Sequence, residues 1–163
     1  MQSQKMLVKL KKASSESQKG NYLKSISLCK KILDKDSQNI ATLKLLATSL
    51  IKLNRFSEVE IVLKKAIKLV SEEESYSLLH LLGCNYIHLG EYVVALKILE
   101  ELFNRTGDSK ILLDIALSYF KLGNYEAARD IYFKLIELEP NNHQAKFNLY
   151  PILLHFQDYK NAW

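Results

Sequence analysis

Apolar residues recur along this chain with the spacing of amphipathic helices, in segments separated by short polar turns. The stretch 111–142 reads ILLDIALSYFKLGNYEAARDIYFKLIELEPNN and contains two such segments. The first leads into KLGNY and the second into EPNN, where glycine, proline and asparagine stop a helix. Apolar residues at i, i+3, i+4 and i+7 bury one stripe of each helix. No segment shows sustained period-two alternation, so we predict an all-α fold built from helix pairs.

The turn within this pair repeats along the chain at intervals of about 34 residues. Its turn position is occupied by Gly20, Asn54, Gly90, Gly123 and, less typically, Gln157. An aromatic residue follows two positions later, at Tyr22, Phe56, Tyr92, Tyr125 and Tyr159. Glycine, and after it asparagine, suits the left-handed backbone position that ends a helix. A fixed period of this length predicts a stack of helical hairpins, an architecture that presents a surface to another protein.

The positions of large, small and aromatic residues in these copies resemble the tetratricopeptide repeat (TPR) family over nearly the whole chain. The best copy carries them at Leu112, Ile115, Ala116, Tyr119, Ala128, Tyr132, Leu135 and Pro140. The third copy has Leu79, Leu82, Gly83, Tyr86, Ala95, Leu99 and Leu102, with Gly107 in place of the proline. The second has Leu43, Leu46, Ala47, Leu50, Val59, Leu63 and Ala66.

This resemblance implies one right-handed α-solenoid of antiparallel helix pairs over residues 1–163. We place four TPR-like repeats at about 6–39, 40–75, 76–108 and 109–142, and a partial fifth at 143–163. The first copy departs from the pattern because Lys9 and Lys12 replace large apolar residues and Glu16 replaces the aromatic, as suits a polar end cap. Its second helix fits better, with Ser25, Cys29 and Ile32. The fifth has Leu149 and Leu153 but stops at Ala162–Trp163, which suggests either a fragment of a longer protein or a repurposed half-repeat.

Composition is that of a globular domain, with 48% hydrophobic and 25% charged residues among 163. No apolar run approaches the roughly 18 residues of a membrane-spanning helix, so we expect no membrane partner. The first twenty residues lack the apolar core of a signal peptide. Cys29 and Cys84 fall on different repeats and are expected to be buried small side chains rather than a disulfide. These features favour a cytoplasmic location.

Charge is distributed unevenly. Residues 1–70 carry 15 Lys and Arg against 5 Asp and Glu, whereas residues 71–163 carry 8 against 13. A solvated basic cap is the simplest interpretation. An acidic partner at the N-terminal end and head-to-tail self-association remain open. Nucleic-acid binding is not favoured, because the lysine-rich stretch has neither an RNA-binding aromatic motif nor a helix-turn-helix signature.

In the TPR family the first helix of each repeat lines a concave groove, and the resemblance assigns groove positions here. They are Lys44, Thr48, Ile51, Lys52, His80, Cys84, Ile87, His88, Lys110, Leu113, Leu117, Phe120, Lys121, Phe147 and His155. The set is basic and apolar, so we expect a protein or peptide partner with acidic and hydrophobic residues. The alternative is that Leu113, Leu117 and Phe147 are covered by a neighbouring helix.

Two specialised grooves of the family are not expected. In the groove for chaperone C-terminal tails, Lys44 matches, but Thr48 and Leu81 stand at the asparagine positions and Asp114 at the arginine position. The asparagine ladder of sugar-transferase arrays requires one asparagine per first helix. The corresponding residues here are Lys11, Leu45, Leu81, Asp114 and Asn148, of which only Asn148 fits.

Candidate chemistry is sparse. His80, Cys84 and His88 fall at i, i+4 and i+8, but the outer two are about 12 Å apart along a helix, so we assign no metal site. Glu72–Glu74 more simply opens a helix, where carboxylates favour the positive end of its dipole. Without a phosphate-binding glycine loop or a Ser–His–Asp pattern, we predict a non-enzymatic interaction scaffold without cofactors. Two alternatives are the N-terminal interaction arm of a glycosyltransferase- or sulfotransferase-type enzyme and a small TPR secretion chaperone.

Overall fold

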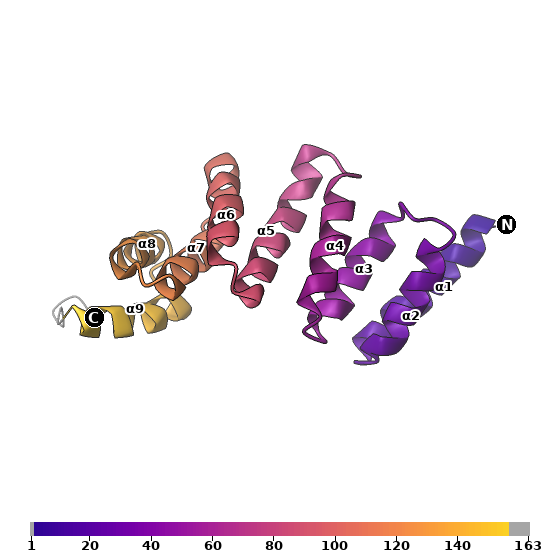
Figure 1. The fold of residues 1–163 in the computed structure, drawn as a ribbon, viewed down its shortest axis with the longest axis horizontal. Coiled ribbons are helices and arrows are strands. Elements are labelled where there is room, and N and C mark those ends of the chain that lie inside the picture. The colour runs from indigo at the N-terminus through magenta and orange to yellow at the C-terminus, as the bar shows by residue number, and fades with distance from the viewer. Residues whose placement is uncertain (1, 157–163) are drawn as a thin grey trace. The chain divides into compact units, whose positions relative to one another are not determined.

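The computed structural model describes residues 2–156, which form helices and turns without a strand (Figure 1). The helices in this range are α1 (Gln2–Gln18), α2 (Tyr22–Leu33), α3 (Ile40–Ile51), α4 (Phe56–Ile67), α5 (Glu72–Leu89), α6 (Tyr92–Thr106), α7 (Lys110–Lys121), α8 (Tyr125–Leu138) and α9 (His143–His155). No helix among them is long and apolar enough to cross a membrane. The predicted turn residue Gln157, its aromatic Tyr159 and the end at Ala162–Trp163 lie outside the described residues.

The chain divides into two compact units, Met1–Asn85 and Tyr86–Trp163, with the boundary inside α5. In the first unit, α2 packs between α1 and α3, and α3 packs against α4. In the second unit, α7 packs between α6 and α8, and α9 packs against α8. Within each unit, these helices pack against their neighbours in sequence, as hairpins of a repeat protein do. The predicted all-α fold of stacked helix pairs is confirmed within each unit.

The four predicted turns that lie within the described residues, at Gly20, Asn54, Gly90 and Gly123, adopt one backbone conformation. Gly20, Gly90 and Gly123 have φ near +80°, and Asn54 is the described non-glycine residue with positive φ, at 55°. The next residue donates its N–H to the carbonyl five positions earlier, as in Asn21 to Glu16 at 2.9 Å and Asn124 to Tyr119 at 3.0 Å. The turn residue itself bonds three positions back, completing a Schellman motif. A left-handed residue is required here, which explains the choice of glycine or asparagine.

Helix starts also follow local chemistry. Asn142 accepts the N–H of Ala145 at 2.9 Å through its side chain and caps the start of α9. Asn124 caps α8 in the same way through the N–H of Ala127 at 3.1 Å. Glu72–Glu74 form the first turn of α5, as predicted. These side chains supply acceptors to N–H groups that have no partner within the helix.

The predicted apolar stripe forms the core. Buried members in the second, third and fourth copies include Leu43, Leu46, Ala47, Leu50, Val59, Leu63, Ala66, Leu82, Tyr86, Ala95, Leu99, Leu102, Leu112, Ile115, Ala116, Ala128, Tyr132 and Leu135. Leu79 and Tyr119 are half-buried. Lys9 and Lys12 of the first copy are exposed, whereas Ser25, Cys29 and Ile32 of α2 are buried. In the first copy, α1 therefore exposes lysines at positions where the other copies have apolar residues, whereas α2 keeps a buried stripe.

Glu16 explains how the first copy manages without its aromatic residue. The residue is only 8% exposed, and its side chain accepts a 2.9 Å hydrogen bond from Asn21 Nδ2 and pairs with Lys24 Nζ at 3.0 Å. The bond from Asn21, then that from Lys24, lowers the pKa of Glu16 below its ordinary value. A carboxylate thus ties the end of α1 to the start of α2, where the other copies use an apolar residue.

Candidate functional site

In the first unit, α3 carries the predicted surface residues of the second repeat. Lys44, Thr48 and Lys52 are exposed at i, i+4 and i+8, while Ile51 is half-buried. The opposite stripe of α3 is buried. The Thr48 hydroxyl donates to the carbonyl of Lys44 at 3.0 Å, so its proton is used within the helix. The exposed stripe therefore offers two cationic side chains with a short hydroxyl residue between them.

In the second unit, α7 carries five predicted residues. Lys110 and Lys121 are exposed at its two ends, and Leu113, Leu117 and Phe120 are half-buried between them. The buried residues of α7 lie elsewhere on the helix, among them Ile111, Leu112, Ile115 and Ala116. The predicted positions are therefore separate from the core stripe. They form an apolar strip with a lysine at each end.

Tyr125, at the start of α8, brings predicted residues of α7 and α9 together. Its ring centroid lies 5.4 Å from that of Phe120 and 4.7 Å from that of His155. The His155 ring in turn lies 5.2 Å from Phe156, and the Arg129 guanidinium lies 5.3 Å from the centre of the Phe156 ring. These distances are typical of packed aromatic rings and of a cation–π contact. We call Phe120, Tyr125, Arg129, His155 and Phe156 the aromatic cluster.

Phe147 of α9 is the most exposed large apolar residue of the described chain, at 77%. It does not pack in the core, unlike Ala145 and Leu149 on either side of it. The sequence left open whether Phe147 is covered by a neighbouring helix, and within the described residues it is not. Its side chain is therefore available as an apolar contact point on α9.

Asn148 matches the asparagine ladder by position, but its amide is used within the chain. Gln144 Nε2 donates to Asn148 Oδ1 at 2.9 Å, and Asn148 Nδ2 donates to the Tyr132 hydroxyl at 3.3 Å. Burial raises the pKa of Tyr132, more than the bond from Asn148 lowers it. Asn148 thus joins α9 to α8.

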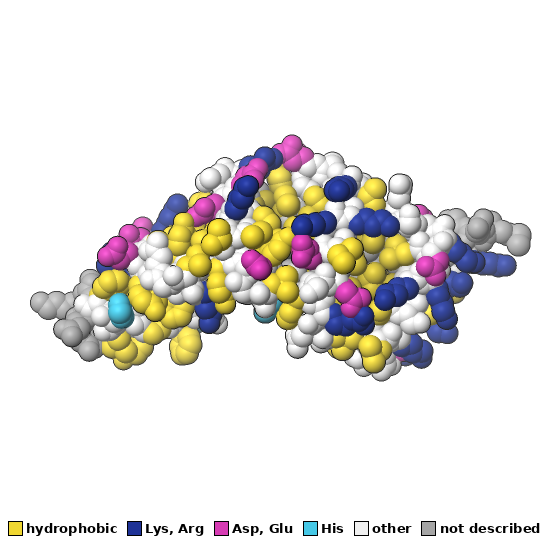
Figure 2. Space-filling model, in the orientation of Figure 1, with side chains coloured by type: hydrophobic (Ala, Val, Ile, Leu, Met, Phe, Trp, Pro, Cys, Tyr) yellow, Lys and Arg dark blue, Asp and Glu magenta, His cyan; other side chains and the backbone are white. Residues whose placement is uncertain are grey.

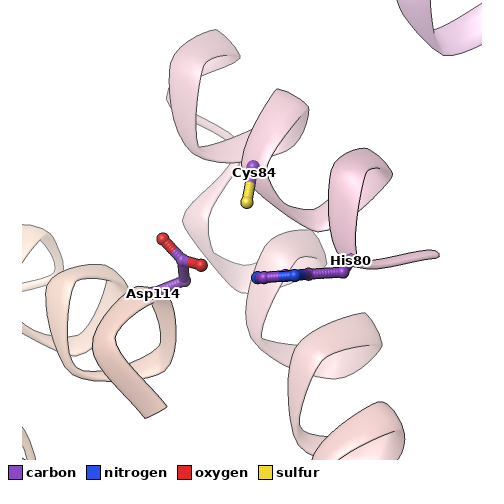
Figure 3. A group of neighbouring side chains, drawn as sticks. All are labelled: His80, Cys84 and Asp114. Atoms are coloured by element: carbon purple, nitrogen blue, oxygen red, sulfur yellow. The ribbon is translucent and has the colours of Figure 1, made fainter. Parts of the chain in front are cut away.

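The predicted residues on α5 are less uniform. His80, Cys84 and Ile87 are half-buried and His88 is exposed. Figure 3 shows the His80 and Cys84 side chains projecting from α5, one turn apart; Asp114, also drawn, belongs to α7 of the second unit. A ring nitrogen of His80 and Sγ of Cys84 lie within 4.8 Å of one another. The spacing predicted the shared helix face, but not the closeness of these two atoms.

Sequence reasoning missed Tyr125 and Arg129 as parts of the candidate surface. Tyr125 carried a signal, because an aromatic residue recurs two positions after each turn, but that recurrence indicated packing alone. Arg129 has no such period. Its guanidinium also pairs with Asp130 at 2.9 Å, so it is held by two contacts. The contact of Arg129 with Phe156, 27 residues later in the chain, does not follow from spacing along one helix.

Charge follows the distribution seen in the sequence. On the face drawn in Figure 2, Lys and Arg side chains gather over the helices of the first unit. Residues 1–70 hold 15 of the 23 Lys and Arg. The surface of this unit is thus suited to acidic groups, and the attraction weakens with added salt.

The sequence and the fold of this chain are similar to those of known helical repeat proteins. Residues 114–147 match the family of the Fis1 C-terminal tetratricopeptide repeat. MamA (residue 41 to its end) from Desulfovibrio magneticus RS-1 superposes with a TM-score of 0.86 at 17% identity, covering 97% of this chain and 89% of MamA. No curated protein matches the sequence.

Two other solved structures have the same fold. YrrB, described as a TPR protein with an unusual peptide-binding site, superposes with a TM-score of 0.74 at 16% identity, covering 94% of this chain and 79% of YrrB. A tetratricopeptide repeat protein from Parabacteroides merdae gives 0.83 at 20% identity, covering 98% of this chain and 63% of that one. The turns, the core and these matches define a helical-hairpin repeat protein. Residues 114–147 resemble the tetratricopeptide repeat family, and the chain has the fold of these solved structures.

Proposed function

We propose that the chain is a non-enzymatic scaffold that binds a protein or peptide along the first helices of its repeats. The fold supports this function because stacked hairpins display side chains in register over a long surface. YrrB, which shares the fold, is described as having a peptide-binding site. The surface is proposed separately for each unit, with α3 in the first and α7 with α9 in the second.

The aromatic cluster carries the proposal. Phe120 and His155 were assigned to the groove from different repeats, and both contact the ring of Tyr125. Side chains from two hairpins thus form one aromatic patch rather than isolated surface residues. Aromatic groups held by their neighbours bind with a small loss of side-chain entropy, which is why they are frequent in hot spots.

The chemistry of the surface indicates the partner. Leu113, Leu117 and Phe147 provide apolar contact, and Lys110 and Lys121 provide charge. None of the proposed surface residues is acidic. A complementary segment therefore carries hydrophobic residues to fill the strip and Asp or Glu to meet the lysines. Cys29 and Cys84 form no disulfide within the described residues, which supports the cytoplasmic location that we propose with this function.

A peptide-binding measurement tests the proposal. A library of labelled peptides that varies acidic and apolar content is screened against the chain, and the best binder is titrated by fluorescence polarisation. We expect Phe147→Ser and Lys121→Glu each to weaken binding by about tenfold or more, because the first removes the most exposed apolar side chain of the surface and the second reverses the charge at one end of the apolar strip. Added salt should weaken binding of the acidic peptide.

Matched controls are available on the second helices. Lys65→Glu on α4 and Lys97→Glu on α6 make the same charge change at exposed positions outside the proposed surface. These variants should retain affinity within about twofold, as rim charges contribute little. Equal losses in control and surface variants would contradict a surface on the first helices. A screen without enrichment of acidic and apolar peptides would contradict the stated partner chemistry.

A further inference from the structure

His80 and Cys84 form a pair of metal-ligating side chains on α5, outside the surface proposed on α3, α7 and α9. They lie one turn apart on α5, both in the first unit, and both are half-buried (Figure 3). A ring nitrogen of His80 and Sγ of Cys84 lie within 4.8 Å of one another. Residues at i and i+4 share a helix face, an arrangement that lets one helix supply two ligands to one ion.

The separation of the two ligand atoms, within 4.8 Å, is close to the separation that a zinc ion requires. With Zn–S near 2.3 Å and Zn–N near 2.0–2.1 Å, two ligands in tetrahedral geometry lie about 3.6 Å apart and cannot exceed about 4.4 Å. Because the two ligand atoms already lie within 4.8 Å, we expect a change of side-chain rotamer, rather than a movement of α5, to bring them into this range. A thiolate with an imidazole is also a donor pair that Zn²⁺ accepts readily. We propose that His80 and Cys84 chelate one Zn²⁺ ion on α5, independently of peptide binding.

Binding of Zn²⁺ requires Cys84 to lose its thiol proton. The S–H bond of Cys84 breaks, its proton passes to solvent, and the thiolate forms the Zn–S bond. The imidazole of His80 binds as the neutral ring through one nitrogen. Water completes the coordination of the ion, as at zinc sites with fewer protein ligands than four. A site with two protein ligands is open, so its metal exchanges more readily than a closed structural zinc.

His88 is the alternative partner of Cys84, because it lies one turn on the other side. It is exposed, whereas His80 is half-buried beside the thiol. A half-buried ligand loses less freedom when it binds and is shielded better from competing water. The pair is therefore His80 with Cys84, and the two histidines can be separated by substitution.

Cobalt(II) provides the direct test, because thiolate coordination gives Co²⁺ a strong near-ultraviolet absorption that nitrogen or oxygen ligands alone do not. The tag-free, reduced, full chain is titrated with Co²⁺ and the complex is then challenged with Zn²⁺. We expect one Co²⁺ per chain, the thiolate band, and loss of that band when Zn²⁺ displaces the cobalt. Absence of the band, or of stoichiometric uptake, would overturn the proposal.

Single substitutions identify the ligands. Cys84→Ser should abolish the thiolate band, and His80→Gln should weaken Co²⁺ affinity at least about tenfold. Cys29→Ser should leave the band and the affinity unchanged, because Cys29 is fully buried. His88→Gln should also retain binding. A band that persists in Cys84→Ser, or a loss caused by His88→Gln and not by His80→Gln, would refute the assignment. Circular dichroism of each variant confirms that it is folded, and peptide affinity measured with and without Zn²⁺ tests the site separately from the scaffold function.

Discussion

The side-chain amide of Asn85 donates a 3.1 Å hydrogen bond to the backbone carbonyl of Phe56, 29 residues earlier in the chain. Phe56 begins α4 and Asn85 lies on α5, so the bond ties two helices of the first unit. Asn85 is also among the largest fully buried side chains. The bond gives the buried amide of Asn85 a partner on another helix, as buried polar side chains require.

Replacing Asn85 should therefore destabilise the first unit. Asn85→Asp keeps the shape of the side chain but removes the donor and places a buried carboxyl against a carbonyl oxygen. We expect a loss of at least about 1–3 kcal/mol at neutral pH, measured by urea denaturation. Asn104→Asp, at an exposed position on α6, provides the control. A variant at residue 85 as stable as this control would show that the bond contributes nothing.

Alanine at the left-handed turn positions should destabilise the folded chain. Gly123 has φ +79°, and an added Cβ would meet nothing within 4 Å, so the cost is backbone strain rather than a clash. We expect Gly123→Ala to lower the free energy of unfolding by about 1–2 kcal/mol. Asn54→Ala should act in the same direction, since Asn54 has φ 55°. Ser57→Ala, inside α4, controls for the added alanine, and equal thermal midpoints for all three would exclude strain at the turns.

Glu16 should make stability sensitive to acid. Its pKa in the folded chain lies below the ordinary value of 4.5, so its contribution is present above about pH 4.5 and is lost as the pH falls through the folded pKa. Glu16→Gln should therefore lower the thermal midpoint near neutral pH, and the difference from wild type should shrink below pH 4.5. Glu137→Gln, at an exposed position of α8, controls for net charge. A difference that stays constant with pH would contradict a role for the charged form.

The two cysteines should differ in reactivity. Cys29 is fully buried, and burial raises its pKa to about 11, so at mildly alkaline pH it is almost entirely the unreactive thiol. Cys84 is half-buried. A chromogenic disulfide reagent should detect one fast thiol in the native chain and two after denaturation. The native Cys84→Ser variant should show none on the same timescale, and two fast thiols in the native wild-type chain would contradict the burial of Cys29.

Pro151 lies inside α9 and has no N–H to donate to the carbonyl one turn back. Since the residue is exposed, Pro151→Ala should restore a helical hydrogen bond without disturbing the core. We expect the free energy of unfolding to rise, by up to about 3 kcal/mol. Lys146→Ala, also exposed on α9, measures the effect of alanine alone. If Pro151→Ala is the less stable of the two, the proline ring makes a contact that outweighs the missing bond.

Much of the fold follows from the sequence because its determinants are local. The turns at Gly20, Asn54, Gly90 and Gly123 need a left-handed residue, and glycine or asparagine at a fixed period marks each one. The cap at Asn142 lies three residues from the N–H that it accepts. The apolar stripe of each helix repeats within four residues. These features could be read without knowing which helices touch.

The tertiary structure decided the contacts between helices. The sequence showed Glu16 only as a departure from an aromatic position, and folding makes it a bridge to Asn21 and Lys24. It showed Phe120 and His155 as separate surface residues, and packing of α7, α8 and α9 places both on Tyr125.

The sequence by itself therefore determined where the helices begin, turn and end, and which stripe of each is buried, because those properties depend on residues within one or two turns. Only the tertiary structure decided that Asn85 reaches Phe56 and that the aromatic cluster forms. Such contacts depend on the distance and crossing angle between packed helices. Those quantities are set by the summed volumes of many core side chains, and no single spacing along the chain encodes them.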